Sequence, residues 1–173
     1  MRRLPAAVAC TAAAVVVAAL LSLPVAAADW ADDEERPDWR EGDVPPAPAW
    51  SAANLIEVEL PGRSVRVGVD PATITLDKKS GVVRYVAVAR GISSVSASYE
   101  GIRCASGEWR TYARQTPGQP WVPAGSSDWQ AMRDARSPHA HWLAGNGMCP
   151  NKTTPADVSS IVRRLKNGRQ AFD

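Results

Sequence analysis

The chain has 173 residues, 45% of them hydrophobic, with 20 basic and 18 acidic side chains and a formal net charge of +2. This length fits one domain and suffices for a hydrophobic core that does not depend wholly on disulfide bonds. Arg2 and Arg3 account for the excess of positive charge, so the rest of the chain is formally neutral. Composition therefore gives no support to a nucleic-acid-binding protein.

The first 28 residues have the pattern of a secretory signal peptide. Met1–Arg3 is basic, residues 4–23 carry no charge, and Pro24–Ala28 ends in small residues. We predict cleavage near Ala28 and a periplasmic or secreted mature protein. The alternative is a membrane anchor, since about 20 apolar residues span a bilayer, but the many alanines and Pro24 argue against it. No later segment is long and apolar enough to span a membrane after cleavage.

Residues 29–53 are interpreted as an acidic arm that precedes a single domain at 54–173. The segment Asp29–Asp43 holds eight acidic residues and two arginines, and prolines and tryptophans run through the arm. Such a composition builds no core of its own and favours extended or disordered backbone. Its tryptophans predict that at least one side chain of the arm docks on the domain.

The region from Leu55 to Pro123 shows the alternation and turn signals of short β-strands. Gly101 lies inside one of these segments, which predicts a bulge or a close approach of another backbone. Six or seven such strands imply an antiparallel sheet, curled or closed into a barrel. The expected strands are 55–60, 65–69, 73–76, 82–90, 95–104, 109–113 and 121–122.

The C-terminal region predicts helices. The apolar residues Val158, Ile161, Val162 and Leu165 recur at helical spacing, and Gly168 supplies a stop. We expect Thr154 to cap this helix, with Pro155 at its first position and Asp157 in its first turn. A shorter helix is expected from Pro138, capped by Ser137, to Gly145. The predicted fold class is α+β: a single antiparallel, curled or barrel-like sheet of about six strands with a C-terminal α-helix and one disulfide.

Two cysteines remain once the segment that contains Cys10 is removed. In an oxidising compartment Cys104 and Cys149 have one possible pairing, and we predict that this disulfide forms. The alternative is a pair of free thiols.

Short strings spread over the chain are specific enough to suggest a family. They are Ser98-Tyr99-Glu100-Gly101-Ile102-Arg103-Cys104, Val69-Asp70-Pro71-Ala72, Gly81-Val82-Val83-Arg84-Tyr85, Trp121-Val122-Pro123-Ala124 with Trp129, Arg36-Pro37-Asp38-Trp39, and Cys149 ahead of a basic helix. Together they resemble the cryptic neisserial protein (CNP-like) family of small secreted bacterial proteins, although Gly145-Asn146-Gly147 departs from its pattern. This resemblance brings no established activity and so assigns no catalytic residue. A weaker similarity to surface adhesin E-type domains implies a sheet-plus-helix module that binds host or envelope proteins.

Catalytic motifs are scarce. The sequence contains no Gly-x-Ser-x-Gly elbow, and His139 and His141 are its only histidines. These two residues could chelate a metal together from a strand but not from a helix, and a closed zinc site needs further ligands. We therefore expect no metal, no cofactor and no catalytic residue, and interpret both histidines as exposed loop residues. The rival hypothesis is a metal-dependent or thiol enzyme that uses His139, His141 and a cysteine.

The leading hypothesis is a non-catalytic module that binds a protein or an envelope component. Trp121 and Trp129 are candidate contacts, because tryptophan is enriched at binding hot spots, although most of the tryptophans are expected in the core. Arg163 and Arg164 form a basic cluster that could make weak contact with anionic envelope lipid or pair with the acidic arm. A purely structural or stress-related envelope protein is the remaining alternative.

Overall fold

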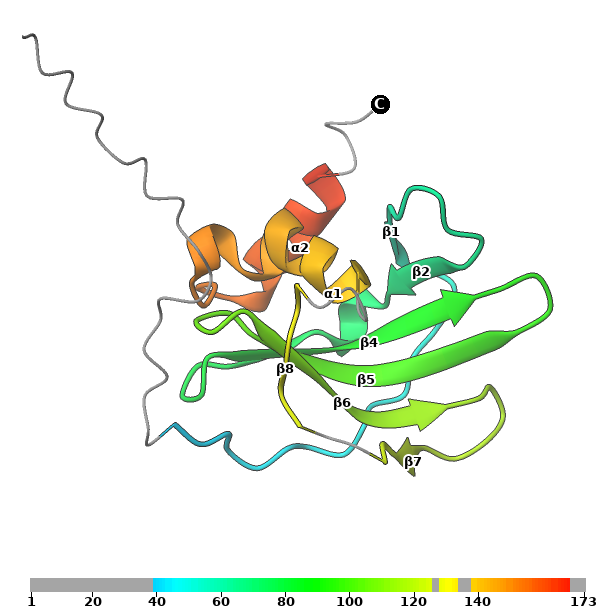
Figure 1. Cartoon of the computed structure of the whole chain (residues 1–173), viewed down its shortest axis with the longest axis horizontal. Helices are drawn as coiled ribbons and strands as arrows, with labels where there is room; N and C mark the ends of the chain where they lie inside the picture. Colours follow the sequence, from blue (N-terminus) through cyan, green and yellow to red (C-terminus); the bar gives the residue numbers. More distant parts are fainter. Residues whose placement is uncertain (1–38, 126–127, 134–137, 169–173) are drawn as a thin grey trace, which may run out of the picture.

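The computed structural model describes residues 39–125, 128–133 and 138–168, so the predicted signal peptide at 1–28 lies outside the described residues. An antiparallel sheet has the strand order β1-β2-β4-β5-β6-β7, with β3 paired to β4 and β8 paired to β6 (Figure 1). Two α-helices lie on one face of this sheet. The strands are β1 (Ile56–Val58), β2 (Arg66–Val69), β3 (Thr75–Asp77), β4 (Val82–Arg90), β5 (Val95–Arg103), β6 (Glu108–Gln115), β7 (Val122–Pro123) and β8 (Gln130–Ala131).

The expected antiparallel sheet is confirmed, but within the described residues it has eight strands rather than about six, and these do not close into a barrel. The difference arises at the flanks of the long strands. On one side of β4, the short strand β3 pairs with the first residues of β4 and β2 pairs with its last residues. One side of β6 is shared in the same way: β8 pairs with its first residues, and β7 pairs with residues near its end. A strand of two residues is too short to show alternation, which is why β8 was not predicted.

The centre of the sheet is the hairpin of β4 and β5, two nine-residue strands in continuous register. Next to it, the register between β5 and β6 shifts between Tyr99 and Glu100. The extra residue is Tyr112 of β6, so the bulge expected in the strand of Gly101 lies in the neighbouring strand. A Cβ atom on Gly101 would lie 2.3 Å from the hydroxyl oxygen of Tyr112, so the close neighbour is a side chain rather than a backbone. The missing side chain lets Tyr112 lie across β5.

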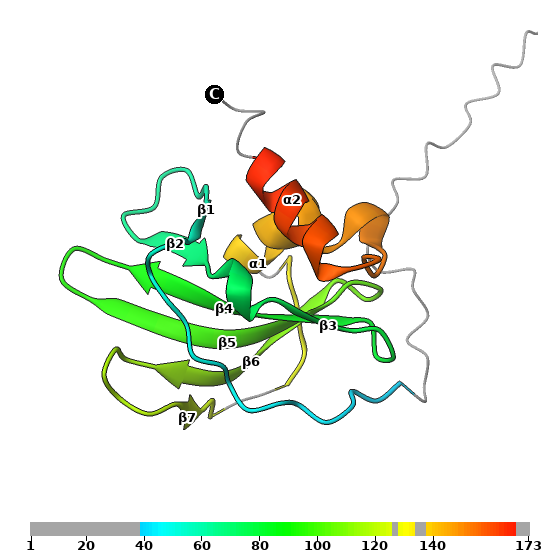
Figure 2. The same ribbon diagram turned by 180° about the vertical axis from the view of Figure 1, so that it is seen from behind.

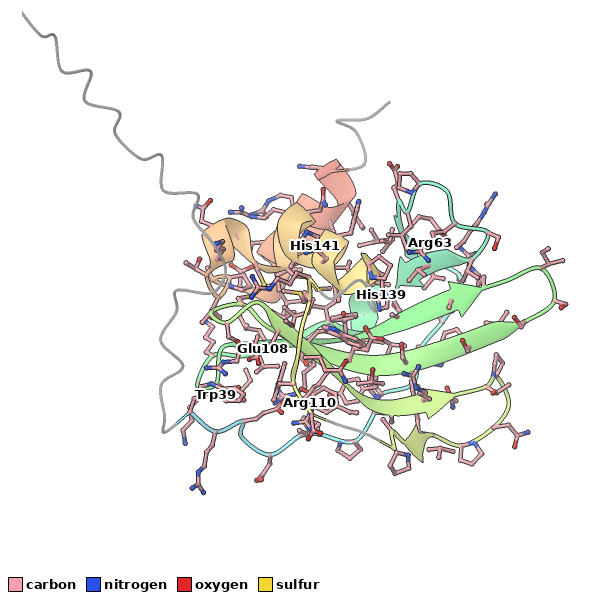
Figure 3. All side chains as sticks on the ribbon, viewed as in Figure 1. Trp39, Arg63, Glu108, Arg110, His139 and His141 are labelled. Carbon is pink, nitrogen blue, oxygen red and sulfur yellow. A yellow bond between two sulfur atoms is a disulfide. The ribbon has the colours of Figure 1, made fainter. Side chains whose placement is uncertain are left out.

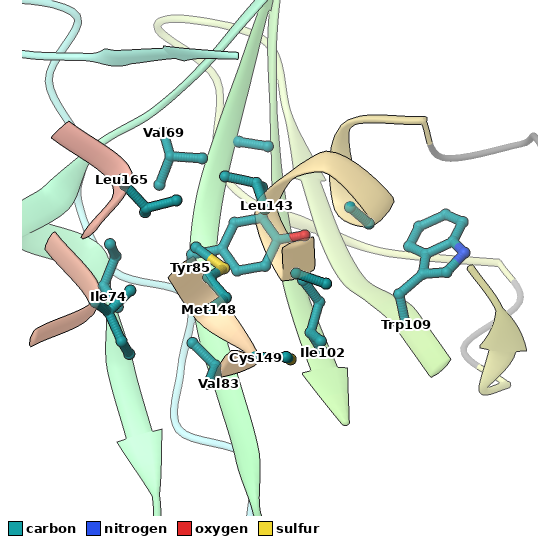
Figure 4. Packing of buried hydrophobic residues seen from close by; sticks show 14 of the residues in the cluster. Val69, Ile74, Val83, Tyr85, Ile102, Trp109, Leu143, Met148, Cys149 and Leu165 are labelled. Carbon is teal, nitrogen blue, oxygen red and sulfur yellow. The ribbon is translucent and has the colours of Figure 1, made fainter. Parts of the chain in front are cut away.

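The main hydrophobic core lies between the sheet and the helices (Figure 4). Tyr85 is fully buried at its centre, and Leu143, Met148 and Leu165 cover it from the helical side. Each of these side chains leaves water completely, which contributes about 1.5–3 kcal/mol for a residue of this size. The sheet residues in this core are Ile56, Val58, Val67, Val69, Val83, Tyr85, Ala87, Ile102 and Trp109.

The helical segments are α1 (Pro138–Leu143) and α2 (Val158–Gly168). The start of α2 corrects the prediction: the cap is Asp157, not Thr154. Its carboxylate accepts the backbone N–H of Ser160 at 2.7 Å, and aspartate at this position satisfies a helix donor that would otherwise be unpaired. The predicted helix from 138 to 145 is confirmed in part. The α-helix α1 ends at Leu143, and Ala144–Met148 continues it as a π-helical turn (η2). The expected cap Ser137 lies outside the described residues.

The predicted disulfide between Cys104 and Cys149 is confirmed, with Cα atoms 5.3 Å apart. It joins the residue that follows β5 to the segment that follows η2. The helical cover is therefore tied covalently to the central hairpin. Among the residues that the structure describes, no helix is long and apolar enough to cross a membrane.

The described part of the acidic arm runs across the face of the sheet opposite to the helices (Figure 2). Trp50 packs against a second cluster of buried residues and donates its indole N–H to Gln115 at 2.6 Å. Glu41 accepts hydrogen bonds from Arg84 at 2.7 Å and from Arg110 at 2.9 Å. The expectation that the arm docks is thus confirmed, and Glu41 pairs with sheet arginines rather than with the basic cluster of α2.

Candidate binding site

A cavity of about 660 Å³ opens on the helical side of the sheet, beside the N-terminal end of α1. Its floor consists of two rows of side chains that cross neighbouring strands. The register places Ala87 opposite Ser98 and Ala89 opposite Ser96. Because these four side chains are small, they leave open space that the helices do not fill. The other lining residues are Val67, Ala97, Glu100, Trp109, Arg114, Gln115, Thr116, Gln119, Pro120, Val122 and His139.

A buried polar cluster closes the inner end of this cavity. Glu100, whose side chain is 3% exposed, accepts hydrogen bonds from Tyr85 at 2.9 Å and from Ser98 at 2.6 Å. The same carboxylate lies 2.8 Å from Nε2 of His139, the second residue of α1 (Figure 3). The His139 ring also meets the edge of Trp109, with centroids 6.3 Å apart. The cluster therefore fixes the start of α1 on the sheet.

The electrostatics of this cluster favour an ion pair. Burial raises the pKa of Glu100, but the charge of His139 and three hydrogen bonds outweigh burial, and the pKa falls below its ordinary value of 4.5. Burial lowers the pKa of His139, yet the Glu100 carboxylate overcomes this and the pKa rises above 6.5. The positive charge of Arg114 opposes that rise. Near pH 6, the cluster is a carboxylate bound to an imidazolium.

The order of groups differs from that of a serine hydrolase. In a hydrolase, histidine lies between the nucleophile and the acid and takes the proton of the serine. Here Glu100 lies between Ser98 and His139, and the Ser98 hydroxyl donates to the carboxylate. The arrangement holds charge and orients side chains without a histidine base at the serine.

Arg114 supplies the other charge at the cavity. It lies on β6 opposite Ser98, and its residue is exposed. Within residues 39–125, 128–133 and 138–168, its guanidinium has no hydrogen-bond or ion-pair partner. A cation at the cavity wall is therefore left for solvent or for a ligand.

The two histidines do not act together. They lie on α1, where residues two apart point in different directions, and His141 is exposed. The interpretation of His139 as an exposed loop residue is wrong, because its side chain is 17% exposed and bound to Glu100. Among the described residues, no group of three or more metal-ligating side chains comes together. Both cysteines of the thiol hypothesis are in the disulfide.

The four residues predicted as a binding surface lie apart. Trp121 packs on the second cluster beside the arm, and Trp129 contacts the edge of Trp39 with centroids 5.7 Å apart. Figure 3 shows Trp39 on the side of the sheet away from the helices. Arg163 and Arg164 are exposed on α2, across the molecule. The two tryptophans thus hold the arm, and the two arginines belong to a different surface.

Sequence reasoning missed Glu100 and its partners, although a signal was present. Ser98, Glu100 and Ile102 alternate along one strand, so a carboxylate occupies the same face as a core isoleucine. A carboxylate on a core face requires a hydrogen-bonding or cationic partner. This pattern was enough to predict a buried acid, although it does not show which of the distant residues pairs with it.

Comparison with known proteins gives one match. No curated protein and no solved structure matches the chain. The model of the CNP1-like family matches residues 34–166, a span that includes the described arm, the sheet, α1, most of α2 and both bonded cysteines. This agrees with the resemblance carried by the short strings of the sequence, and the chain belongs to the CNP1-like family.

Proposed function

We propose that this protein is a non-catalytic binding module that takes a ligand in the cavity beside the N-terminal end of α1. The observation that carries the proposal is the small-residue floor of β4 and β5, which leaves about 660 Å³ open beside a buried charged cluster. Ligand sites in proteins have volumes of about 300–1,000 Å³ and combine apolar walls with a few fixed polar groups. The cavity has both properties.

The rigidity of the walls supports the same proposal. The floor belongs to the longest hairpin of the sheet, and the inner wall is fixed by the Glu100–His139 pair. A preformed site loses little conformational entropy when a ligand binds. If the predicted signal peptide directs export, the ligand is a protein segment or a small component of the bacterial envelope.

A blocking variant tests the proposal. Ser96 is exposed and lines the cavity, so Ser96→Trp fills the space without a change in the core. Ser93→Trp is the matched control, because Ser93 is exposed on the same hairpin and does not line the cavity. Both variants and the wild type are screened by saturation-transfer NMR against a library of small organic fragments.

We expect a set of fragments to bind the wild type and Ser93→Trp and to lose binding in Ser96→Trp. Amide spectra verify that all three proteins are folded. The proposal is overturned if no fragment binds, or if the fragments bind Ser96→Trp as well as they bind the wild type.

A further inference from the structure

The cavity carries a surplus of positive charge. Three ionisable side chains line it among the described residues: Glu100, Arg114 and His139. Glu100 is already neutralised by His139 at 2.8 Å and saturated by the hydroxyl groups of Tyr85 and Ser98. Arg114 has no such partner in the part of the chain that the structure describes, so a bound anion would gain an ion pair there without breaking one that the structure shows.

The guanidinium group of Arg114 limits which classes of anion bind well at this position. A guanidinium presents parallel N–H donors that match two oxygens of a carboxylate or of a phosphate, and the single guanidinium in this lining balances the single negative charge of a carboxylate. Ser98 lies opposite Arg114 in the sheet, which places the open cavity floor directly beside the guanidinium-bearing residue. A carboxylate at Arg114 therefore lies at one end of the cavity, with the rest of its molecule over the floor.

The opposite end of the floor is apolar. Ala87 and Ala89 lie on β4, and Val67 of β2 pairs with Ala89. Three strand spacings separate β6 from β2, a distance of about 14 Å at 4.8 Å per strand. The cavity thus has a cation at one end and aliphatic side chains about 14 Å away, a distance that a short acyl chain can bridge.

We infer that the cavity binds a small amphipathic carboxylate, with its anionic group at Arg114 and its apolar body along Ala87, Ala89 and Val67. The inference rests on the proposed function and specifies the ligand class. Burial of the aliphatic part favours binding, and the ion pair at Arg114 sets the orientation.

Octanoate is the probe that tests this inference, and octanamide is its uncharged match in length. Binding is followed in the full protein by titration of the amide signals of Ala89 and Ser96. We expect octanoate to shift both signals and octanamide to bind about tenfold more weakly, a difference of about 1.4 kcal/mol. Arg114→Gln is expected to reduce octanoate affinity about tenfold and to leave octanamide unchanged.

Arg40→Gln is the control for loss of a positive charge, because Arg40 is an exposed arginine of the arm and does not line the cavity. Its octanoate affinity is expected to match the wild type. Equal binding of octanoate and octanamide, or an Arg114→Gln variant with unchanged affinity, overturns the carboxylate inference. If octanoate fails while library fragments still bind in the cavity, the ligand class is wrong and the proposed function stands. If neither binds, both fail.

Discussion

Replacement of Glu41 by alanine tests whether the acidic arm is a structural part of the domain. Glu41 and Arg84 face each other with side chains only 7% and 4% exposed. The Glu41 carboxylate also accepts from Arg110 at 2.9 Å and from the hydroxyl of Tyr112. Glu41→Ala removes the acceptor and leaves the buried Arg84 guanidinium with Asp77, whose oxygen is 3.6 Å away, as its remaining anion.

The magnitude follows from this loss of compensation. Removal of one partner from a buried ion pair costs about 3–5 kcal/mol, because the other charge stays buried. Asp77 is partly exposed and retains some of the interaction, so we expect a loss of about 3 kcal/mol for Glu41→Ala. A typical domain has about 5–15 kcal/mol of stability, so the variant is expected to fold with a clearly lower urea midpoint.

Urea unfolding at constant pH measures the effect, and three further variants show that it is specific to the buried pair. Asp43→Ala removes an exposed acid from the same arm and is expected to change stability by less than about 0.5 kcal/mol. Arg84→Met alone leaves the Glu41 carboxylate with Arg110 and Tyr112 as its partners, whereas Glu41→Ala with Arg84→Met removes both members of the most buried pair. The double variant is therefore expected to lose less stability than the sum of the single variants. A Glu41→Ala protein as stable as Asp43→Ala would refute the reasoning.

Three other perturbations have defined outcomes. The His139 pKa is raised and the Glu100 pKa is lowered, so the pair stabilises fully between about pH 4.5 and 6.5. Stability is expected to fall as pH rises through the folded-state pKa of His139 in the wild type but not in His139→Gln, as measured by urea titrations at several pH values. Reduction of the disulfide, which spans a sequence separation of 45, is expected to cost on the order of 4 kcal/mol in the same assay; a loss below about 1 kcal/mol would contradict the role given to it. Gly101→Ala places a Cβ 2.3 Å from the Tyr112 oxygen and is expected to cost about 1–3 kcal/mol, whereas Gly125→Ala meets no atom within 4 Å and is expected to be neutral.

Long elements with strong periodicity were predictable from the sequence. The strand at 82–90 is β4 with the same bounds, and the apolar stripe of α2 faces the core as expected. The helix start was misplaced because Thr154 and Asp157 both have capping side chains, and local sequence does not show which one the chain uses. Sheet closure was overestimated because strand number alone does not fix it. It depends on whether edge strands meet, and here β1 and β7 end the order.

The candidate site was harder to predict because it depends on long-range contacts. Glu100 and His139 are 39 positions apart in the chain, and no local pattern links a strand carboxylate to a helix histidine. The tryptophans were ambiguous for a similar reason. Trp121 and Trp129 pack beside the arm, and only the fold shows that the arm covers that face. The type of a residue was enough to name it as a candidate site residue. Only the topology of the fold showed which other residue it contacts.

The pattern of side-chain size along β4 supports the proposal that the cavity takes a ligand. On the face covered by the arm, side chains stay large from Arg84 through Val86 to Val88. On the helical face, size falls from Tyr85 to Ala87, at the point where the helices end. A merely solvated strand end favours β-branched or charged side chains, which protect the sheet and raise strand propensity. Small residues at these positions weaken the strand and gain only space, which is the space that the proposed ligand requires.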